Sequence, residues 1–327
     1  VIKVRIFVFT RIPQNYVICL SAHLEHLIDK NVINKYNVYI MICDICPRSC
    51  RVDRAKAAGF CQETEEIRIS KVMLHKYEEP LISGGEKDKG SGAIFFAGCN
   101  LKCVYCQNFP ISHKNKGKNI SVDELVNIFK DLERKGALNI NLVTPTHFTM
   151  QIIAALKIYK PSIPIVWNSS GYESVETIEK LKGYVDIFLV DLKYMSDDLS
   201  TKYSGAINYV EAATKSILKM RELQPKDVIE KGQMKKGVIV RHLVLPTHTD
   251  DSIKCLDFIL KNLGKDTIVS IMSQYEPRYD AKKFPEIDRK ITPIEYKRVV
   301  NFAIKNDMKN CFVQDLSSAD SKYTPKF

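Results

Sequence analysis

Short apolar runs alternate with amphipathic stretches from about residue 90 onward. Seven of these runs are rich in β-branched residues and end at turn-forming residues, which is typical of strands. The predicted strands are residues 93–97, 139–143, 164–167, 185–190, 238–245, 267–272 and 310–314. Because strands that alternate with helices usually pair side by side in parallel, the pattern predicts a parallel α/β sheet.

The stretches between the strands have the capping residues and the periodicity of helices. Ser121 and Glu124 have the spacing of a capping box, and Gly136 lies where a C-cap glycine is expected. Further helices are expected at 148–159, 174–182, 208–222, 250–263 and 293–306. Six or seven such units in succession predict a partial (β/α) barrel of six or so parallel strands, or a full barrel, with a doubly wound sheet as the alternative.

The chain is expected to have four segments. Residues 1–40 mix cations with apolar residues and lack the pattern of a signal peptide, so they are either an upstream extension before Met41 or an ordinary hairpin or helix. A four-cysteine module with a connecting segment is expected at 41–89, the barrel at 90–316 and a tail at 317–327. No apolar run reaches the roughly 18 residues of a membrane span, so no membrane association is expected.

Composition narrows the class of protein. With 45% hydrophobic residues, 14 Gly and 13 Pro in 327 residues, the chain is neither collagen-like nor disordered. Its net charge is +11, but the densest lysine cluster, at 114–118, is short, so nucleic-acid binding is not indicated. Ten cysteines without a secretory signal predict a cytoplasmic protein, and seven of them form two tight groups that favour metal ligation over disulfides.

The first cysteine group follows the first predicted strand. Cys99, Cys103 and Cys106 have the spacing C-x3-C-x2-C within one loop. A cubane cluster takes four ligands, so three cysteines leave one iron open to an outside ligand. Zinc with His113 as a fourth ligand is the competing interpretation, although the usual paired knuckles are absent.

This motif also carries a family resemblance. CNLKCVYC matches the C-x3-C-x-aromatic-C signature of the radical S-adenosylmethionine (SAM) superfamily. Over residues 41–316 the chain resembles the branch related to pyruvate formate-lyase activating enzyme, through the segments IFFAGCNLKCVYCQN, LVTPTHF, VWNSSGYE, LVDLKY, VRHLVLP and SIMSQYEP. The resemblance implies a [4Fe–4S] cluster that binds SAM, reductive cleavage to a 5′-deoxyadenosyl radical, and hydrogen abstraction from a substrate. It also implies an electron donor such as flavodoxin or ferredoxin.

Polar residues gather at the C-terminal ends of the predicted strands, where (β/α) barrels have their active sites. Taken singly they are ordinary caps and turn formers; taken together with the cluster loop they favour a site. The resemblance implies that the methionine end of SAM binds Thr144, Thr146 and His147, and that the ribose lies near Asn168 and Ser170. It also implies that Tyr105 lies beside the adenine. Asp191 and Lys193 match the DLK element of the activating enzymes. Arg241 or His242 could reach the SAM carboxylate, but neighbouring positions of a strand face opposite ways, so only one of the two can point inward. Arg241 is favoured, with a surface salt bridge as the alternative for it.

The second cysteine group lies before the barrel. Cys43, Cys46, Cys50 and Cys61 provide four thiolates, which suits a closed site for structural zinc or for a saturated auxiliary iron–sulfur cluster. Arginines at 48, 51 and 54 offset the negative charge of either metal group. Zinc is slightly favoured, because no neighbouring residue suggests redox work.

Together these features predict a radical SAM enzyme. The resemblance to activating enzymes implies that it abstracts hydrogen from a glycine of a partner protein. Radical modification of another protein or of a small metabolite is the second hypothesis. A non-catalytic zinc-binding interaction module is the third, in which zinc fills the cysteine triad. Gly84-Gly85-Glu86 repeats the GGE with which many superfamily members bind the SAM amino group, but it precedes the cluster loop and has the composition of a solvated turn, so no such role is expected.

Overall fold

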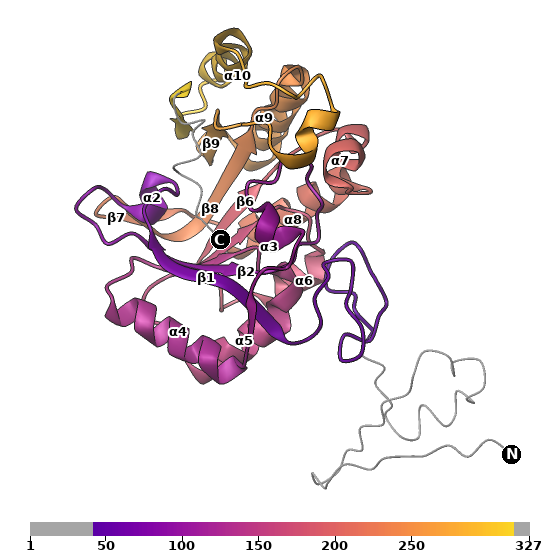
Figure 1. The fold of residues 1–327 in the computed structure, drawn as a ribbon. Helices are drawn as coiled ribbons and strands as arrows, with labels where there is room; N and C mark the ends of the chain where they lie inside the picture. Colours follow the sequence, from indigo (N-terminus) through magenta and orange to yellow (C-terminus); the bar gives the residue numbers. More distant parts are fainter. Residues whose placement is uncertain (1–41, 317–327) are drawn as a thin grey trace, which may run out of the picture.

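A mostly parallel sheet forms the centre of the molecule in the computed structural model, which describes residues 42–316 (Figure 1). Its strands lie in the order β10 (Cys311–Val313), β9 (Ile268–Met272), β8 (Gln233–Leu243), β6 (Ile187–Asp191), β5 (Ile165–Ser169), β4 (Ile140–Val143), β2 (Ser91–Phe96), β1 (Ile67–His75) and β3 (Lys118–Ile120). The seven strands from β2 to β10 pair in parallel. Because β10 and β3 end the sheet without pairing with each other, the barrel is partial and open, as predicted.

Helices follow most of the parallel strands at the places that the sequence predicts. They are α4 (Val122–Arg134), α5 (Thr149–Ile158), α6 (Val175–Lys180), α8 (Tyr209–Leu223), α9 (Thr249–Leu263) and α10 (Pro293–Lys305). The Ser121 side chain accepts a hydrogen bond from the Glu124 backbone, and the Glu124 side chain accepts one from the Ser121 backbone. The predicted capping box therefore starts α4, and Thr292 with Glu295 starts α10 in the same way.

Several elements were not predicted. The strands are β1, β3 and β7 (Val228–Glu230), which pair antiparallel with their neighbours. The helices are α2 (Pro80–Ser83), α3 (Phe109–Ser112), α7 (Asp197–Ser204) and the 3₁₀ turns η2 (Thr146–Phe148) and η3 (Tyr279–Lys283). Most of these elements are only three to five residues long, which is too short for a clear pattern in the sequence. β1 is longer, but it carries Arg68 and Lys71 among its apolar residues and so lacks the apolar run of a buried strand.

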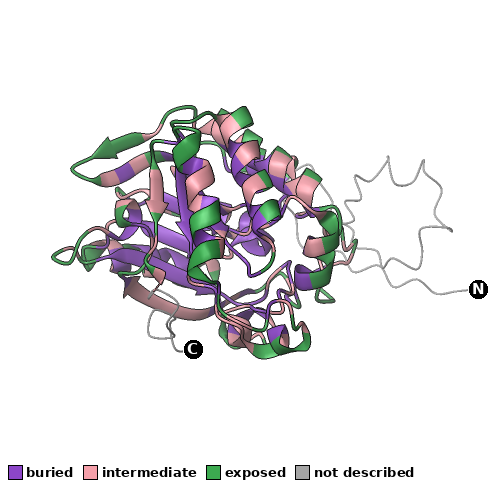
Figure 2. Ribbon diagram, turned by 90° about the horizontal axis from the view of Figure 1, so that it is seen from above, coloured by how far each residue is buried: buried purple, intermediate pink, exposed green. Residues whose placement is uncertain are grey.

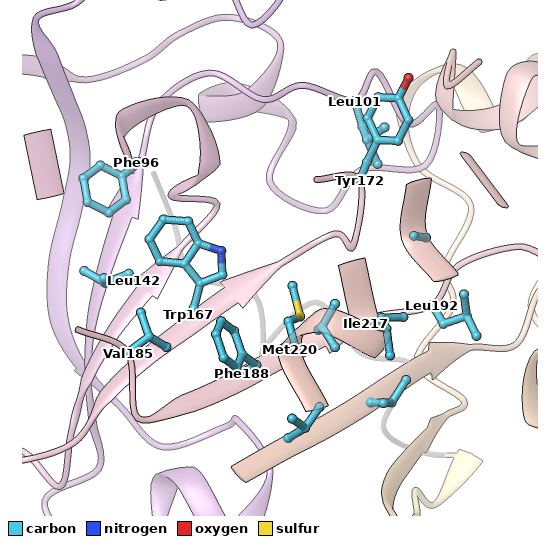
Figure 3. Packing of buried hydrophobic residues seen from close by; sticks show 14 of the residues in the cluster. Phe96, Leu101, Leu142, Trp167, Tyr172, Val185, Phe188, Leu192, Ile217 and Met220 are labelled. Atoms are coloured by element: carbon cyan, nitrogen blue, oxygen red, sulfur yellow. The ribbon is translucent and has the colours of Figure 1, made fainter. Parts of the chain in front are cut away.

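The two faces of the sheet have different partners. Side chains such as Trp167 and Phe188 join the large core between the sheet and the helices (Figure 3). The central strands β2, β4, β5, β6 and β9 are buried almost along their whole length (Figure 2). The alternate residues Val166 and Leu189 face the opposite side, where they pack with Ile82 of α2. Because strand positions alternate, the same inner face carries Asn168 and Asp191 further along β5 and β6. The inner face is thus apolar near α2 and polar at the C-terminal ends of the strands.

The four-cysteine module packs onto the barrel through side-chain hydrogen bonds to backbone oxygens. Ser174 and Thr177 donate to the Ile45 carbonyl at 3.2 and 2.6 Å, and the Arg54 guanidinium donates to the carbonyls of His147 and Thr64. The predicted extension at 1–40 and the tail at 317–327 lie outside the described residues. The four-segment division therefore stays a prediction. No helix within residues 42–316 has the length and apolar character to cross a membrane.

Candidate active site

A cavity of about 250 Å³ opens at the C-terminal ends of the parallel strands. Three parts of the chain enclose it: the loop after β2, the ends of β4 to β9, and the segment that joins β1 to α2. Its wall contains most of the residues that the sequence singled out, namely Cys99, Cys103, Tyr105, Cys106, Thr144, Asn168, Ser170, Asp191, Lys193 and Arg241. The fold therefore brings together residues that are up to 142 positions apart in the chain.

The cysteine triad occupies the loop between β2 and α3. This loop is fixed by backbone bonds to the end of α7, where Lys102 donates to the Ser204 carbonyl at 2.9 Å. Cys103 Sγ lies 3.0 Å from Ser204 Oγ, and Cys106 Sγ lies 3.2 Å from Ser112 Oγ. The Leu101 backbone N–H points at Cys99 Sγ from 3.4 Å. Each of the three sulfurs thus has a polar neighbour that helps to hold its position.

The electrostatics of the triad fit a bound cationic group. Burial raises the pKa of Cys99 to about 12 and that of Cys106 to about 11, and the neighbouring Cys103 adds to both shifts. The thiolates therefore need a metal group to become stable at neutral pH. Within residues 42–316, no three His, Cys, Asp or Glu side chains converge on a single metal ion. Three thiols in one loop can ligate three irons of a [4Fe–4S] cluster and leave the fourth iron open to an outside ligand, so the triad fits such a cluster.

His113, the alternative fourth ligand for zinc, has other contacts. Its ring stacks on Phe109 with the centroids 4.3 Å apart, and its Nδ1 lies 2.8 Å from Ser112 Oγ. Burial lowers the pKa of His113 to about 4. The structure gives no contact between this imidazole and the triad sulfurs, so zinc with His113 as its ligand has no support here.

A buried charge network lies across the inner face of the sheet. Arg241 on β8 donates to Asp191 Oδ1 at 2.8 Å, to Glu78 Oε2 at 3.0 Å and to Asn168 Oδ1 at 2.6 Å. Lys193 Nζ lies 2.7 Å from Asp191 Oδ2. Burial alone would raise the pKa of Asp191, but the cations Arg241 and Lys193 outweigh it and hold that pKa below its usual value. The network therefore keeps charged side chains in one orientation at the cavity wall.

Arg241 and His242 face opposite sides of β8. The Arg241 guanidinium reaches the cavity, whereas His242 is buried on the helix side, where its Nδ1 lies 2.7 Å from the Leu192 carbonyl oxygen. Burial lowers the pKa of His242 to about 4, so this imidazole is neutral at pH 7. Of the two, Arg241 is the residue placed to meet a ligand.

Two acidic residues of the site were missed by sequence reasoning. Glu78, from the segment between β1 and α2, lines the cavity and accepts hydrogen bonds from Asn141 and Asn168 at 3.2 Å each. Glu173 is buried below the cavity and accepts bonds from Trp167, Ser169 and Thr146. Glu173 belongs to the segment VWNSSGYE and so had a sequence signal. Glu78 had none beyond the acidic pair before Pro80.

Thr144, Thr146 and His147 do not share one environment. Thr144 lines the cavity with φ at +58°, a conformation that is rare for a β-branched residue and costs of order 1–3 kcal/mol. Thr146 donates to Glu173 at 2.9 Å, and His147 Nε2 lies 2.6 Å from the Ala97 carbonyl oxygen. Both are outside the cavity wall, so a direct contact with a ligand is supported for Thr144 alone. Thr146 and His147 instead anchor the loop from below.

Tyr105 lines the cavity between two other tyrosines. Its hydroxyl bonds with that of Tyr194, and its ring meets Tyr275 edge to face at a centroid distance of 5.6 Å. Tyr194 also bonds with Ser204, which touches Cys103. The aromatic wall is thus linked directly to the cysteine triad.

The four cysteines of the N-terminal module lie close to one another. A Cβ atom added at Gly59 would lie 3.5 Å from Cys50 Sγ and 3.7 Å from Cys61 Sγ. The Phe60 backbone N–H donates to Cys50 Sγ at 3.2 Å. Burial raises the pKa of Cys46 to about 12, and the charges of the other three thiols add to this shift. Burial also raises the pKa of Cys61, so Cys46 and Cys61 need a metal group to become stable thiolates at neutral pH.

Comparison with known proteins matches residues 93–259, about half of the chain, to the model of the radical SAM superfamily. The chain is 35% identical over 293 residues to the uncharacterized protein MJ0674 of Methanocaldococcus jannaschii, covering 86% of this chain and 80% of that protein. It is 26% identical over 212 residues to the pyruvate formate-lyase-activating enzyme of Clostridium pasteurianum, covering 62% of this chain and 82% of that enzyme.

Similar solved structures were also found. One is Streptococcus suis SuiB bound to S-adenosylmethionine, with a TM-score of 0.47, 16% identity and coverage of 68% of this chain. This chain spans about half the length of SuiB (49%). Another is methylornithine synthase (PylB), with a TM-score of 0.45, 12% identity, and coverage of 66% of this chain and 68% of that one.

Proposed function

Because the chain belongs to the radical SAM superfamily, we propose that it cleaves SAM reductively at a [4Fe–4S] cluster held by Cys99, Cys103 and Cys106. One observation carries this proposal: the three thiols line the same cavity as the polar strand-end residues. When bound, the cluster supplies the electron that splits SAM into methionine and a 5′-deoxyadenosyl radical.

The charge network suits the polar groups of SAM. SAM offers an ammonium, a carboxylate, a sulfonium and ribose hydroxyls, which pair best with fixed groups of opposite charge or with amides. Asp191 and Glu78 provide carboxylates, and Lys193 and Arg241 provide cations, all at the cavity wall. Since Arg241 is held by three acceptors, little rotational freedom is lost when it binds a ligand.

The remaining wall excludes water and fixes the loop at the end of β4. Tyr105 and Tyr275 give one side of the cavity an aromatic surface, which limits the water that reaches a reactive radical. Thr144 is proposed to contact the methionine end of SAM. Thr146 and His147 are proposed as positioning residues for that loop, through Glu173 and the Ala97 carbonyl.

For the substrate, we propose a glycine residue of a partner protein, from which hydrogen is abstracted. The similarity to a pyruvate formate-lyase-activating enzyme supports this class. The test is to mix the reduced enzyme and SAM with fractions of a cell extract and to look for a glycyl radical by EPR. Formation of 5′-deoxyadenosine with a small-molecule fraction and without a protein radical would favour a metabolite substrate.

The SAM-cleavage proposal itself is tested with two cysteine variants. Cys103→Ala removes one proposed ligand, whereas Cys311→Ala changes a half-buried cysteine of β10 that lines no part of the cavity. With dithionite and SAM under anaerobic conditions, the wild type and Cys311→Ala should form 5′-deoxyadenosine, and Cys103→Ala should form none. Equal product from both variants would refute the ligand assignment. Zinc in place of iron in the wild type would favour the interaction-module hypothesis.

A further inference from the structure

The three sulfurs of the cysteine triad have different polar neighbours. Cys99 Sγ has the Leu101 backbone N–H, whereas the sulfurs of Cys103 and Cys106 each have a serine hydroxyl. The shorter of the two hydroxyl contacts is that of Ser204 with Cys103, at 3.0 Å. Ser204 is fully buried. This contact is therefore both close and shielded from bulk water.

Two backbone hydrogen bonds fix the position of Ser204 relative to Cys103. The Lys102 N–H donates to the Ser204 carbonyl at 2.9 Å, and the Val104 N–H donates to the Tyr203 carbonyl at 2.8 Å. Cys103 lies between these two donors in the chain, so the last turn of α7 is tied to the cluster loop on both sides of this cysteine. The backbone thus holds the serine hydroxyl at the sulfur.

Ser204 is the inner end of a chain of three hydroxyl groups that leads to the cavity. Its Oγ lies 2.8 Å from the Tyr194 hydroxyl, which also bonds with the Tyr105 hydroxyl. Tyr194 is fully buried, and Tyr105 lines the cavity wall. The hydroxyl chain, defined by these three residues, therefore connects the cavity wall to a proposed ligand of the cluster.

A metal-bound thiolate decides which way the protons of the hydroxyl chain point. Such a sulfur carries no proton and can only accept a hydrogen bond. Ser204 then donates its single proton to Cys103, and its oxygen accepts the proton of Tyr194. Tyr194 accepts the proton of Tyr105 in the same way. Each hydroxyl polarises the next, which strengthens the last hydrogen bond, the one to sulfur.

The second serine hydroxyl is not committed to its sulfur in this way. Ser112 Oγ lies 3.2 Å from Cys106 Sγ but 2.8 Å from His113 Nδ1, and that nitrogen is an acceptor in one of the two neutral tautomers. The single proton of Ser112 therefore has two acceptors to choose from. The other neighbour of Ser204 brings a proton of its own, so the proton of Ser204 is left for the sulfur.

Hydrogen bonds to sulfur are one of the means by which a protein sets the reduction potential of an iron–sulfur cluster. The electron gained on reduction adds negative charge, which the cluster shares with its sulfur ligands. A donor at a sulfur therefore stabilises the reduced state more than the oxidised state and raises the reduction potential. The Ser204 hydroxyl is such a donor, and its burial strengthens the interaction because the surroundings have a low dielectric constant.

We propose that Ser204 is a positioning residue of the active site, and that the hydroxyl chain raises the reduction potential of the triad's cluster through Cys103. The proposal gives a chemical role to Ser204 and Tyr194, which both lie outside the cavity wall. This inference rests on the proposed function, because it assumes an iron–sulfur cluster at the triad.

The test is a redox titration of the anaerobically reconstituted full chain, followed by EPR, with iron counted in each protein. Ser204→Ala removes the donor to sulfur, whereas Tyr194→Phe removes the next hydroxyl and leaves Ser204 in place. Ser216→Ala is the matched control, because Ser216 is also fully buried but bonds with two backbone carbonyls rather than with a sulfur. The signal of the triad is identified as the one that is absent from Cys103→Ala.

Ser204→Ala should keep the iron content of the wild type and shift the midpoint potential of this cluster to a more negative value. The equilibrium constant for its reduction should fall by roughly tenfold, which corresponds to about 59 mV for a one-electron couple. Tyr194→Phe should lower the same constant by roughly twofold, because the remaining Ser204 hydroxyl is less polarised. Ser216→Ala should have the potential of the wild type.

A spectroscopic measurement separates the hydrogen bond from a general effect on packing. After exchange into D2O, ENDOR of the reduced cluster should show one exchangeable proton fewer in Ser204→Ala than in the wild type and in Ser216→Ala. A purely structural role for Ser204 would lower stability or iron content without changing the potential or this proton.

An unchanged or more positive potential in Ser204→Ala, at wild-type iron content, would overturn the inference and leave the SAM-cleavage proposal intact. Tyr194→Phe keeps both Ser204 and Cys103, so it tests the hydroxyl chain even if Ser204→Ala loses its iron. An unchanged potential in Tyr194→Phe would then overturn the inference. A wild type without any cluster signal that depends on Cys103 would instead overturn the proposed function.

Discussion

Replacing Glu78 by Gln tests whether the buried charge network holds Arg241 in place. Three carboxylates surround the Arg241 guanidinium, with N–O distances of 2.8 Å to Asp191, 3.0 Å to Glu78 and 3.9 Å to Glu79. The substitution keeps the size of the side chain and one acceptor oxygen. It removes one charge and can turn an amide N–H toward the guanidinium, where two donors repel each other.

The size of the effect follows from distance and burial. At an effective dielectric constant of about 20, two unit charges 3.0 Å apart attract by about 5–6 kcal/mol. Part of this is returned, because the neutral amide of the Glu78→Gln variant is cheaper to bury than a carboxylate, and Asp191 still balances Arg241. Breaking a buried pair usually costs about 3–5 kcal/mol, so with this compensation we expect a loss of about 2–3 kcal/mol in the free energy of unfolding.

Urea unfolding at pH 7, followed by circular dichroism, measures this loss, and Glu86→Gln is the matched control. Glu86 lies exposed in the turn after α2, and its side chain is no part of the cavity wall, so this control should stay within about 0.5 kcal/mol of the wild type. The same variants are titrated with SAM after cluster reconstitution. A Glu78→Gln protein as stable as the Glu86→Gln protein, with unchanged SAM affinity, would refute the role given to the network.

Three other substitutions test further parts of the site. The cations Arg241 and Lys193 outweigh the effect of burial and lower the pKa of Asp191 in the folded chain. The ionised Asp191 therefore stabilises the fold above about pH 4, and this contribution is lost as the pH falls through the lowered pKa. Asp191→Asn should therefore be less stable than the wild type at pH 7, and urea unfolding at falling pH should show the difference shrinking below about pH 4; a constant difference down to pH 2 would contradict this. Thr144→Val keeps the shape of the side chain and removes its hydroxyl, so SAM binding should weaken by roughly 1–3 kcal/mol in equilibrium titrations while stability stays unchanged; unchanged SAM binding would remove Thr144 from the site. Gly98→Ala should destabilise the chain by about 1–3 kcal/mol more than Gly183→Ala, because both glycines have positive φ but only Gly98 has neighbours within 4 Å of an added Cβ. Equal losses in urea unfolding would argue against the close packing of Gly98 on the Cys61 carbonyl oxygen.

Local sequence signals were sufficient for the parallel core of the fold. The strands β4, β5, β6 and β9 are short and buried on both faces, so their apolar runs identify them within about two residues of the predicted bounds. β1 lacks such a run because it pairs antiparallel at one side of the sheet and is only partly buried. The alternation of burial along such a strand, with Arg and Lys among the apolar residues, gives a weak signal.

The candidate site was predictable where it depends on strand ends and not where it depends on long-range pairing. Asn168, Asp191 and Arg241 follow from their positions on predicted strands, and the parity of β8 separates Arg241 from His242. Glu78 becomes part of the site through hydrogen bonds to residues far along the chain: Asn141, Asn168 and, 163 residues later, Arg241. No periodicity or motif in one sequence encodes such a pairing.

The position of Glu78 and α2 has a consequence for protein engineering. The segment that matches the family model begins at residue 93, so it omits Glu78, Ile82 and the whole of β1. A chimera that transfers only this segment would leave Arg241 without one of its partners and would expose the apolar inner face that Ile82 covers. A functional transplant must therefore include the residues from the module through α2, because this segment supplies Glu78 of the cavity wall and the hydrogen bond from Arg48 to Asn100 in the cluster loop.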